Sequence, residues 1–245
     1  MKARLDQELT KRGITTTRSQ AESWIRLGEV TVDGEIVTKP GHFVRDDAVI
    51  VLTAKDQYVS RAGLKLASVA ELLHLDFKDS VVLDVGSSTG GFTDYALRHG
   101  AKKVYAIDVG TDQLHPSLQD NEKIELHEKT DIRDFYMPND KPDIVVIDVS
   151  FISLREILPH IAKNLSNSST LIAAMLKPQF EAGRHQTNKG VIKNDAMRRQ
   201  ILKDFEMWSK RYFFIKDKRD SSVHGANGNQ ERFYLLSVIN AASHR

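Results

Sequence analysis

Residues 82–97 read VLDVGSSTGGFTDYAL, and this stretch decides the fold. A short apolar run, Val82 to Val85, leads into a glycine-rich turn, and a helix is expected to begin at about Gly91. In a doubly wound α/β domain, such a turn places a ligand at the carboxyl ends of the strands, above the helix N-terminus. Gly86 and Gly90 let the backbone approach that ligand closely.

The chain beyond this turn alternates strands and helices. Strands are expected at 81–85, 103–108, 124–127, 143–148, 171–176, 212–216 and 232–239, and helices at about 61–74, 91–99, 153–165 and 194–211. Alternation of this kind predicts a parallel sheet covered on both faces. The last two strands lie too close for a crossover helix, so they should pair antiparallel. We therefore predict a Rossmann-like α/β domain with a seven-stranded, mostly parallel sheet and an antiparallel last strand.

The first 58 residues follow a different pattern. Two short amphipathic helices precede VTVDGEIV, in which Asp33-Gly34 is a strong hairpin signal. This pattern predicts a small α+β domain over residues 1–58, a linker over 59–63 and the larger domain over 64–245.

Composition excludes several classes of protein. The chain has no cysteine, so disulfide scaffolds, cysteine-based zinc sites and thiol nucleophiles are ruled out. Its nine histidines show no paired metal-ligand spacing, and no metal is expected. The N-terminus lacks an apolar segment after its basic residues, and no apolar run approaches the ~18 residues of a spanning helix. A cytoplasmic protein without a membrane partner is the expectation.

The turn favours a cationic cofactor over a dinucleotide. Ser88 occupies the middle glycine position of the dinucleotide motif, and Asp84 would repel a pyrophosphate. S-adenosylmethionine carries a sulfonium and an amino group, which suit an acidic strand edge. Asp108 is placed for the ribose hydroxyls and Asp131 for the adenine amino group. A nicotinamide site is the alternative, and each carboxylate could instead cap a helix.

Two lysines and two carboxylates are expected at one edge of the sheet. Asp148 and Lys177 end two strands, Glu231 precedes the last strand, and Lys65 lies in the first helix of the larger domain. This set suits deprotonation of an alcohol before methyl transfer. An isolated lysine, with a pKa of about 10.4, is a poor base at neutral pH, but a neighbouring lysine and partial burial would lower that value. The alternative is that these residues form solvated surface ion pairs.

With these motifs in view, the whole chain resembles the TlyA (hemolysin A) family of rRNA 2′-O-methyltransferases, which carry an FtsJ-like catalytic domain. The resemblance rests on RLDQELTKRGITTTRSQAESWIRLGEVTVDG, which is similar to the αL RNA-binding domain of a ribosomal protein, and on DVGSSTGGFTDYAL, VIDVSFISL, LKPQFEAG and GNQERF. It implies a catalytic tetrad at Lys65, Asp148, Lys177 and Glu231, and cytidine in bacterial ribosomal RNA as substrate. It also implies cofactor contacts from the turn and two later carboxylates: Gly86, Ser87, Ser88, Thr89, Gly90, Asp108 and Asp131. Asp84 joins these candidate cofactor contacts because of its charge.

Two features bear on this resemblance. Ser221-Ser222-Val223-His224 stands where the family usually has Ser-Pro, so the substrate-side loop lacks a rigid turn residue. The chain also ends soon after RFYLLSVI, and shorter family members are associated with modification of the large ribosomal subunit only. The large subunit is therefore the expected partner.

Candidate RNA contacts lie in both predicted domains. Clustered cations would bind phosphates in a salt-sensitive way without reading sequence, and the candidates are Arg4, Lys11, Arg12, Arg18 and Arg26 near the first two helices, with Arg61, Arg133 and Lys189 nearer the crevice. The alternative is that the basic residues of the first two helices only form a solvated helix face, which would give the same sequence pattern. Phe151 is either a core anchor or a platform for a flipped base.

Two functions from other classes remain as alternatives. A non-catalytic ribosome-binding or assembly factor would bind no methyl donor, and it would show no loss of methylation on Lys177→Ala. A cytolysin is suggested only by the older family name, and a liposome leakage assay would detect it. The sequence gives the cytolysin no physical support, because it has no strongly amphipathic basic helix.

Overall fold

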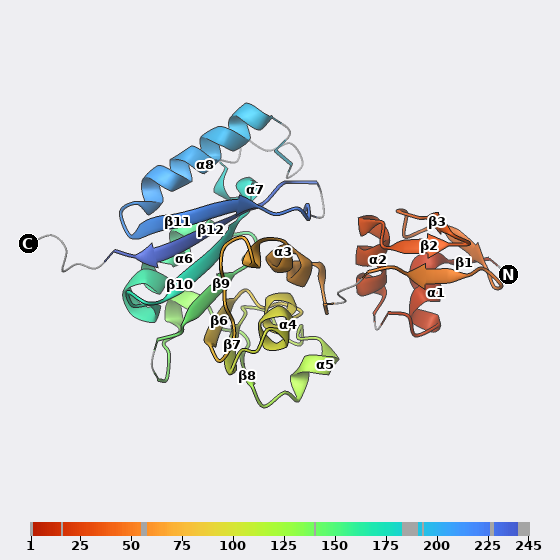
Figure 1. Ribbon diagram of the computed structural model, residues 1–245, viewed down its shortest axis with the longest axis horizontal. Helices are drawn as coiled ribbons and strands as arrows, with labels where there is room; N and C mark the ends of the chain where they lie inside the picture. The colour runs from red at the N-terminus through yellow and green to blue at the C-terminus, as the bar shows by residue number, and fades with distance from the viewer. Residues whose placement is uncertain are drawn as a thin grey trace, which may run out of the picture. The chain divides into compact units, whose positions relative to one another are not determined.

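A computed structural model describes residues 2–15, 17–54, 58–139, 141–182, 191–192, 194–225 and 228–239. The chain divides into two compact units, Met1–Leu64 and Lys65–Arg245 (Figure 1). Each unit has its own hydrophobic core. In the ranges just given, no helix has both the length and the apolar character needed to cross a membrane.

The N-terminal unit consists of two helices and two small sheets. The helices are α1 (Leu5–Lys11) and α2 (Arg18–Leu27), and the strands are β1 (Lys2–Arg4), β2 (Val30–Val32), β3 (Glu35–Ile36), β4 (Phe43–Arg45) and β5 (Ile50–Leu52). Strand β1 pairs with β4, and the other three follow the order β3-β2-β5. Asp33 and Gly34 both have positive φ, as the tightest hairpin turns require. The β1–β4 pair was not predicted, because strands of three residues are too short to show a period of two.

The second unit is built on the seven-stranded sheet that the sequence predicted. Its order is β11-β12-β10-β9-β6-β7-β8, and its strands are β6 (Val81–Val85), β7 (Lys103–Ile107), β8 (Ile124–His127), β9 (Ile144–Ile147), β10 (Leu171–Leu176), β11 (Phe213–Asp220) and β12 (Arg232–Val238). Strands β8, β7, β6, β9 and β10 are parallel, whereas β12 runs antiparallel to both β10 and β11. The predicted fold class, including the antiparallel last strand, is confirmed.

Helices cover both faces of this sheet. On one face, α6 (Leu154–His160) and α8 (Asp195–Ser209) contribute Leu158, Leu202 and Phe205 to the main core. On the other face, the ring of Phe92 in α4 (Gly91–Arg98) packs 5.9 Å from that of Phe233 in β12. Helix α3 (Arg61–Ala70) precedes β6.

Three helical details differ from the expectation. The predicted helix over 153–165 changes after α6 into a π-helical turn, Ile161–Leu165, because Pro159 lacks the N–H that a regular helix would use. Two single-turn helices, α5 (Pro116–Gln119) and α7 (Pro178–Glu181), were not predicted. Both begin with proline, which favours the first helical position, but each is too short to show a helical period.

Candidate active site

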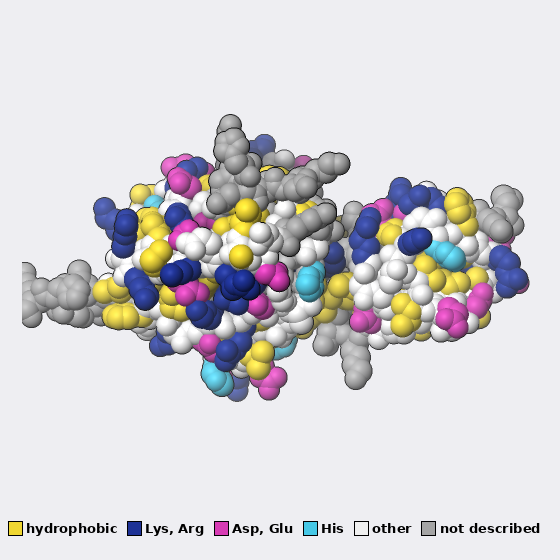
Figure 2. All heavy atoms as spheres, turned by 90° about the horizontal axis from the view of Figure 1, so that it is seen from above, with side chains coloured by type: hydrophobic (Ala, Val, Ile, Leu, Met, Phe, Trp, Pro, Cys, Tyr) yellow, Lys and Arg dark blue, Asp and Glu magenta, His cyan; other side chains and the backbone are white. Residues whose placement is uncertain are grey.

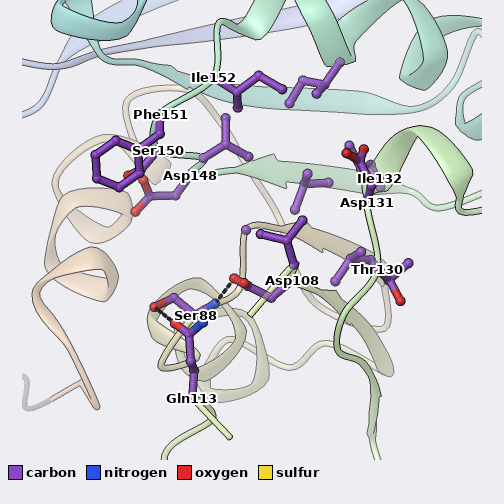
Figure 3. Close-up of a pocket in the computed structure, with 16 residues that line it drawn as sticks. Ser88, Asp108, Gln113, Thr130, Asp131, Ile132, Asp148, Ser150, Phe151 and Ile152 are labelled. Carbon is purple, nitrogen blue, oxygen red and sulfur yellow. Dashed lines mark hydrogen bonds between the residues drawn. The ribbon is translucent and has the colours of Figure 1, made fainter. Parts of the chain in front are cut away.

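A cavity of about 360 Å³ lies at the carboxyl ends of β6, β7 and β9. Figure 3 shows Asp148 and Phe151 at one end, Thr130 and Asp131 at the other, and Asp108 between them in this view. Sixteen residues line it: Val85, Gly86, Ser88, Ile107, Asp108, Val109, Gln113, Thr130, Asp131, Ile132, Asp148, Val149, Ser150, Phe151, Ile152 and Ile157. The cavity therefore combines apolar walls with three carboxylates.

The glycine turn allows two backbones to come close at the cavity. Gly86 has φ +81°, and a Cβ there would lie 2.6 Å from the carbonyl oxygen of Asp148. The Ser88 N–H donates to Oδ2 of Asp108 (2.8 Å), and the Gly110 N–H donates to Oδ1 (2.7 Å). These two bonds fix the Asp108 carboxylate and leave lone pairs on both oxygens for a ligand.

Asp131 lines the cavity and is held by Arg133. The guanidinium donates through Nε to Oδ1 (2.9 Å) and through Nη2 to Oδ2 (2.6 Å). This hydrogen bonding to Arg133 lowers the pKa of Asp131. Arg133, which the sequence offered as an RNA contact, is thus placed to orient Asp131.

Asp84 lies behind the cavity and does not line it. Its side chain is fully buried, Oδ2 accepts a hydrogen bond from Thr93 Oγ1 (2.7 Å), and Oδ1 has no partner among the described residues. Burial raises the pKa of Asp84 to about 7. Ser87, Thr89 and Gly90 also lie outside the lining, so only Gly86, Ser88, Asp108 and Asp131 of the predicted cofactor contacts face the cavity.

The predicted tetrad forms two ion pairs. Lys177 Nζ lies 2.5 Å from Asp148 Oδ1, and Lys65 Nζ lies 2.5 Å from Glu231 Oε2. The four side chains are only 11%, 15%, 9% and 3% exposed, in that order. Solvated surface ion pairs are therefore the wrong description of these residues. Lys177 Nζ also donates to Ser150 Oγ (2.8 Å), a contact that the sequence analysis missed.

Strand register places both pairs at the same edge of the sheet. Leu176 of β10 pairs with Arg232 of β12, so the next residue, Lys177, lies beside Glu231. Ala174 pairs with Ile147 of β9, which brings Asp148 to the other side of β10. The tetrad therefore spans three adjacent strand ends and receives Lys65 from α3.

The loop before Glu231 is held without the proline of the family pattern. Ser221 is buried, and its Oγ accepts from the Val223 N–H (3.1 Å). The Ser221 N–H donates to the Glu231 carbonyl (3.0 Å). A Cβ at Gly225 would lie 2.9 Å from Glu231 Oε1. Glycine at 225 therefore lets this loop close over the Glu231 carboxylate.

Phe151 is not a core anchor, because its side chain is 92% exposed. It lines the cavity, three residues after Asp148 in the chain. Its ring centroid lies 5.2 Å from that of Phe180. Its φ is 67°, a left-handed conformation that costs a bulky residue about 1–3 kcal/mol. Strain of this kind is concentrated at functional sites.

Glu181, the last residue of α7, has a structural role. Its carboxylate accepts from Ser153 Oγ (2.7 Å) and the Leu154 N–H (2.6 Å), at the start of α6. It is an N-terminal helix cap supplied from α7.

Three arginines of the N-terminal unit are held by buried acids. Arg4 and Arg18 both bind Asp6, whose side chain is fully buried and whose pKa these hydrogen bonds lower to about 2. Arg12 donates to Glu8 and to two backbone carbonyls, which makes it a structural residue. Of the other candidates, Lys11 lies 3.7 Å from Glu8, Arg26 is exposed, Arg61 begins α3, and Lys189 lies outside the described residues.

In the part of the chain that the structure describes, no group of three or more His, Cys, Asp or Glu side chains is arranged to hold a metal ion.

Comparison with known proteins identifies both units. A family model for FtsJ-like methyltransferases matches residues 58–237, and one for the S4 domain matches residues 3–50. Hemolysin A of Brachyspira hyodysenteriae is 40% identical, covering 96% of this chain and 99% of its own. The 23S rRNA (cytidine-2′-O)-methyltransferase TlyA of Campylobacter jejuni is 43% identical over 72% of this chain and 70% of its own.

A solved structure agrees with these matches. A hemolysin-like protein of Streptococcus thermophilus superimposes with a TM-score of 0.76 at 36% identity, over 98% of this chain and 89% of that one. The resemblance predicted from the motifs is thus confirmed. The chain belongs to the FtsJ-like methyltransferase family and, within it, to the TlyA and hemolysin A group that carries an N-terminal S4 domain.

Proposed function

We propose that this chain transfers a methyl group from S-adenosylmethionine to the ribose 2′-hydroxyl of a cytidine in ribosomal RNA. The observation that carries the proposal is the buried Lys177–Asp148 pair, whose carboxylate lines the cavity. The substrate named for the Campylobacter jejuni relative supports the choice of cytidine and of the large subunit. The reaction would take place in the cytoplasm, where ribosomes are found.

The residues at the cavity fit S-adenosylmethionine. Asp108 would accept hydrogen bonds from the ribose hydroxyls and Asp131 from the adenine amino group, while Val109 and Ile132 supply apolar walls. The unpartnered oxygen of Asp84 lies behind the turn, and a cationic ligand bound in the cavity would favour the ionised form of this carboxyl. When bound, the cofactor supplies an electrophilic methyl group.

We assign Lys177 as the general base that removes the proton of the 2′-hydroxyl. In the neutral amine, the two N–H bonds point to Asp148 and Ser150, so the lone pair would be left to face the substrate oxygen. The amine removes the 2′-hydroxyl proton as the oxygen becomes nucleophilic. Lys65, held by Glu231, lies at the same edge and stabilises the negative charge that develops on that oxygen.

RNA binding would be divided between the two units. Residues 1–58 would bind phosphates through exposed cations such as Lys11, Arg18 and Arg26, and 64–245 would catalyse, with 59–63 as the linker. Phe151 would stack on the target base, because an exposed and strained aromatic side chain stands at the cavity. Arg61, Arg133 and Lys189 are proposed as further contacts near the target.

Methyl transfer to purified ribosomal subunits tests this proposal. Large subunits from a strain that lacks the enzyme would be incubated with the full chain and isotopically labelled S-adenosylmethionine, and their nucleosides analysed by mass spectrometry. We expect labelled 2′-O-methylcytidine. Label on a base, or no label with folded protein that binds the cofactor, would contradict the proposal.

A further inference from the structure

The outer face of α8 carries a ridge of cations. Arg199, Lys203 and Lys210 are all exposed, and Met207, 55% exposed, lies between them. At 100° per residue, these four positions fall within about 80° of one another around the helix. The opposite side of α8 is buried through Ile201, Leu202 and Phe205.

The acids nearby do not neutralise this ridge. In the described part of α8, ion pairs join Arg198 to Asp220 and Glu206 to Lys218, and neither uses a ridge residue. Other helices of the chain pair their cations four residues apart, as Arg98 does with Asp94. Asp195 and Glu206 each stand four residues before a ridge cation, but among the described residues neither forms an ion pair with it, and Arg199 and Lys203 are like charges four residues apart.

The ridge stands out on the surface of the molecule. Figure 2 looks onto the side of the molecule where α8 lies uppermost in Figure 1, and it shows many Lys and Arg side chains over this part, with Asp and Glu side chains among them. Among the described residues, the three ridge cations are therefore exposed and form no ion pair with the fold.

The ridge begins beside the active site. Arg198 donates through Nε to the carbonyl of Gln230 (3.2 Å), the residue before Glu231. Asp220 binds both Arg198 (2.6 Å) and Arg232 (2.7 Å), which ties the start of α8 to the start of β12. From Arg199 the ridge runs about 16 Å away from that edge, at 1.5 Å per residue.

We infer that Arg199, Lys203 and Lys210 form a second RNA-binding surface, located on the methyltransferase unit and separate from the S4 domain. It binds phosphates of the strand that leads to the target nucleotide. The inference rests on the proposed function, since it takes ribosomal RNA as the polyanion. Because the contacts are to phosphate, they contribute affinity and salt dependence but no sequence selectivity.

Salt titration of RNA binding tests the ridge. The full-length variant Arg199→Gln/Lys203→Gln/Lys210→Gln is compared with Lys78→Gln/Lys102→Gln/Lys123→Gln, which removes the same charge from exposed lysines elsewhere in the unit. Affinity for protein-free 23S rRNA is measured between about 50 and 200 mM salt. We expect the ridge variant to lose about tenfold in affinity and its log–log salt slope to fall by about 2–3, at 0.7–0.9 for each lost phosphate contact. The control should match the wild type.

The possible outcomes separate this inference from the proposed function. Wild-type methylation together with equal slopes for the ridge and control variants would overturn the ridge but leave the function standing. A wild type that neither binds nor methylates rRNA would overturn both. The ridge variant could instead lose binding to phosphatidylglycerol vesicles while its RNA affinity keeps the salt slope of the wild type. That result would assign the ridge to an anionic membrane and overturn the inference. Calorimetric binding of S-adenosylmethionine should be the same in all three proteins, and thermal unfolding should show the ridge variant to be at least as stable as the wild type, because it lacks the like charges four residues apart.

Discussion

Asp6 in the N-terminal unit and Asp84 in the methyltransferase unit are both fully buried, yet their environments are opposite. Asp6 has two arginine partners, and its pKa is lowered to about 2. Asp84 has one hydroxyl partner, and burial raises its pKa to about 7. The first carboxylate has its countercharge within the fold, whereas the second has a free oxygen beside the proposed site of a cationic cofactor.

The same contrast extends to the cations of the two units. Arg18 and Lys11 are 51% and 73% exposed although their acidic partners are buried, so their charge remains available to a polyanion. Lys65 and Lys177 are as buried as their partners. Half-exposed cations suit salt-sensitive binding, and buried cations suit action on one atom in a low-dielectric site.

The largest expected effect is on the buried pair at the cavity. Lys177→Met should slow methyl transfer by about 100- to 10,000-fold, because it removes the group that accepts the proton. Single-turnover kinetics with labelled cofactor measures this loss. Lys102→Met, an exposed lysine at the opposite ends of the strands, serves as the control. A rate within threefold of the wild type would remove Lys177 from the mechanism.

The next effect concerns pH. Because the folded-state pKa of Asp84 is raised from 3.8 to about 7, its contribution to stability is fully present below about pH 4 and is lost as the pH rises through 7. The wild type should therefore lose unfolding free energy as the pH rises from 4 to 8, whereas Asp84→Asn should not. The difference between the two proteins should shift in favour of the variant by roughly 2–4 kcal/mol over this range. Urea denaturation at several pH values checks this, and parallel curves would show that Asp84 has an ordinary pKa.

Asp6→Asn should give the opposite sign. The lowered pKa of Asp6 means that its stabilisation is present above about pH 4 and is lost as the pH falls through 2. We expect a loss of about 1–2 kcal/mol at pH 7, less than the full value because Arg4 and Arg18 are half exposed and screened. The deficit should shrink below pH 4. A deficit that stays constant with pH would mean that packing, and not charge, explains it.

The smallest effect is expected at Arg26. It is exposed, so Arg26→Gln should leave the unfolding free energy within about 0.5 kcal/mol of the wild type. The slope of RNA affinity against salt should fall by about 0.7–0.9. Arg12→Gln is the matched comparison, since Arg12 donates to Glu8, Asp46 and Ala48 and should cost stability instead. If the two variants had the same unfolding free energy and the same salt slope of RNA affinity, the division into structural and RNA-binding arginines would be wrong.

Strand ends could be predicted from the sequence and side-chain environments could not. Asp148 and Lys177 follow apolar runs, so parallel pairing brings them to one edge whatever the loops do. Asp84 is fully buried, and its hydrogen-bond partner Thr93 comes from α4, a contact that the sequence pattern does not predict. The positive φ of Phe151 could not be predicted, because the position holds neither glycine nor asparagine. The hydrogen bond from Lys177 to Ser150 joins two loops that are 27 residues apart in the sequence.

The measurement that tests the account most directly separates rate from affinity in two variants of the full chain. Single-turnover methylation of large ribosomal subunits gives the rate, and titration at fixed salt gives the dissociation constant. We predict that Lys177→Met loses at least 100-fold in rate with affinity within twofold of the wild type, and that Arg26→Gln loses affinity with an unchanged saturated rate. Loss of affinity without loss of rate in Lys177→Met would contradict the assignment of chemistry to the buried pair.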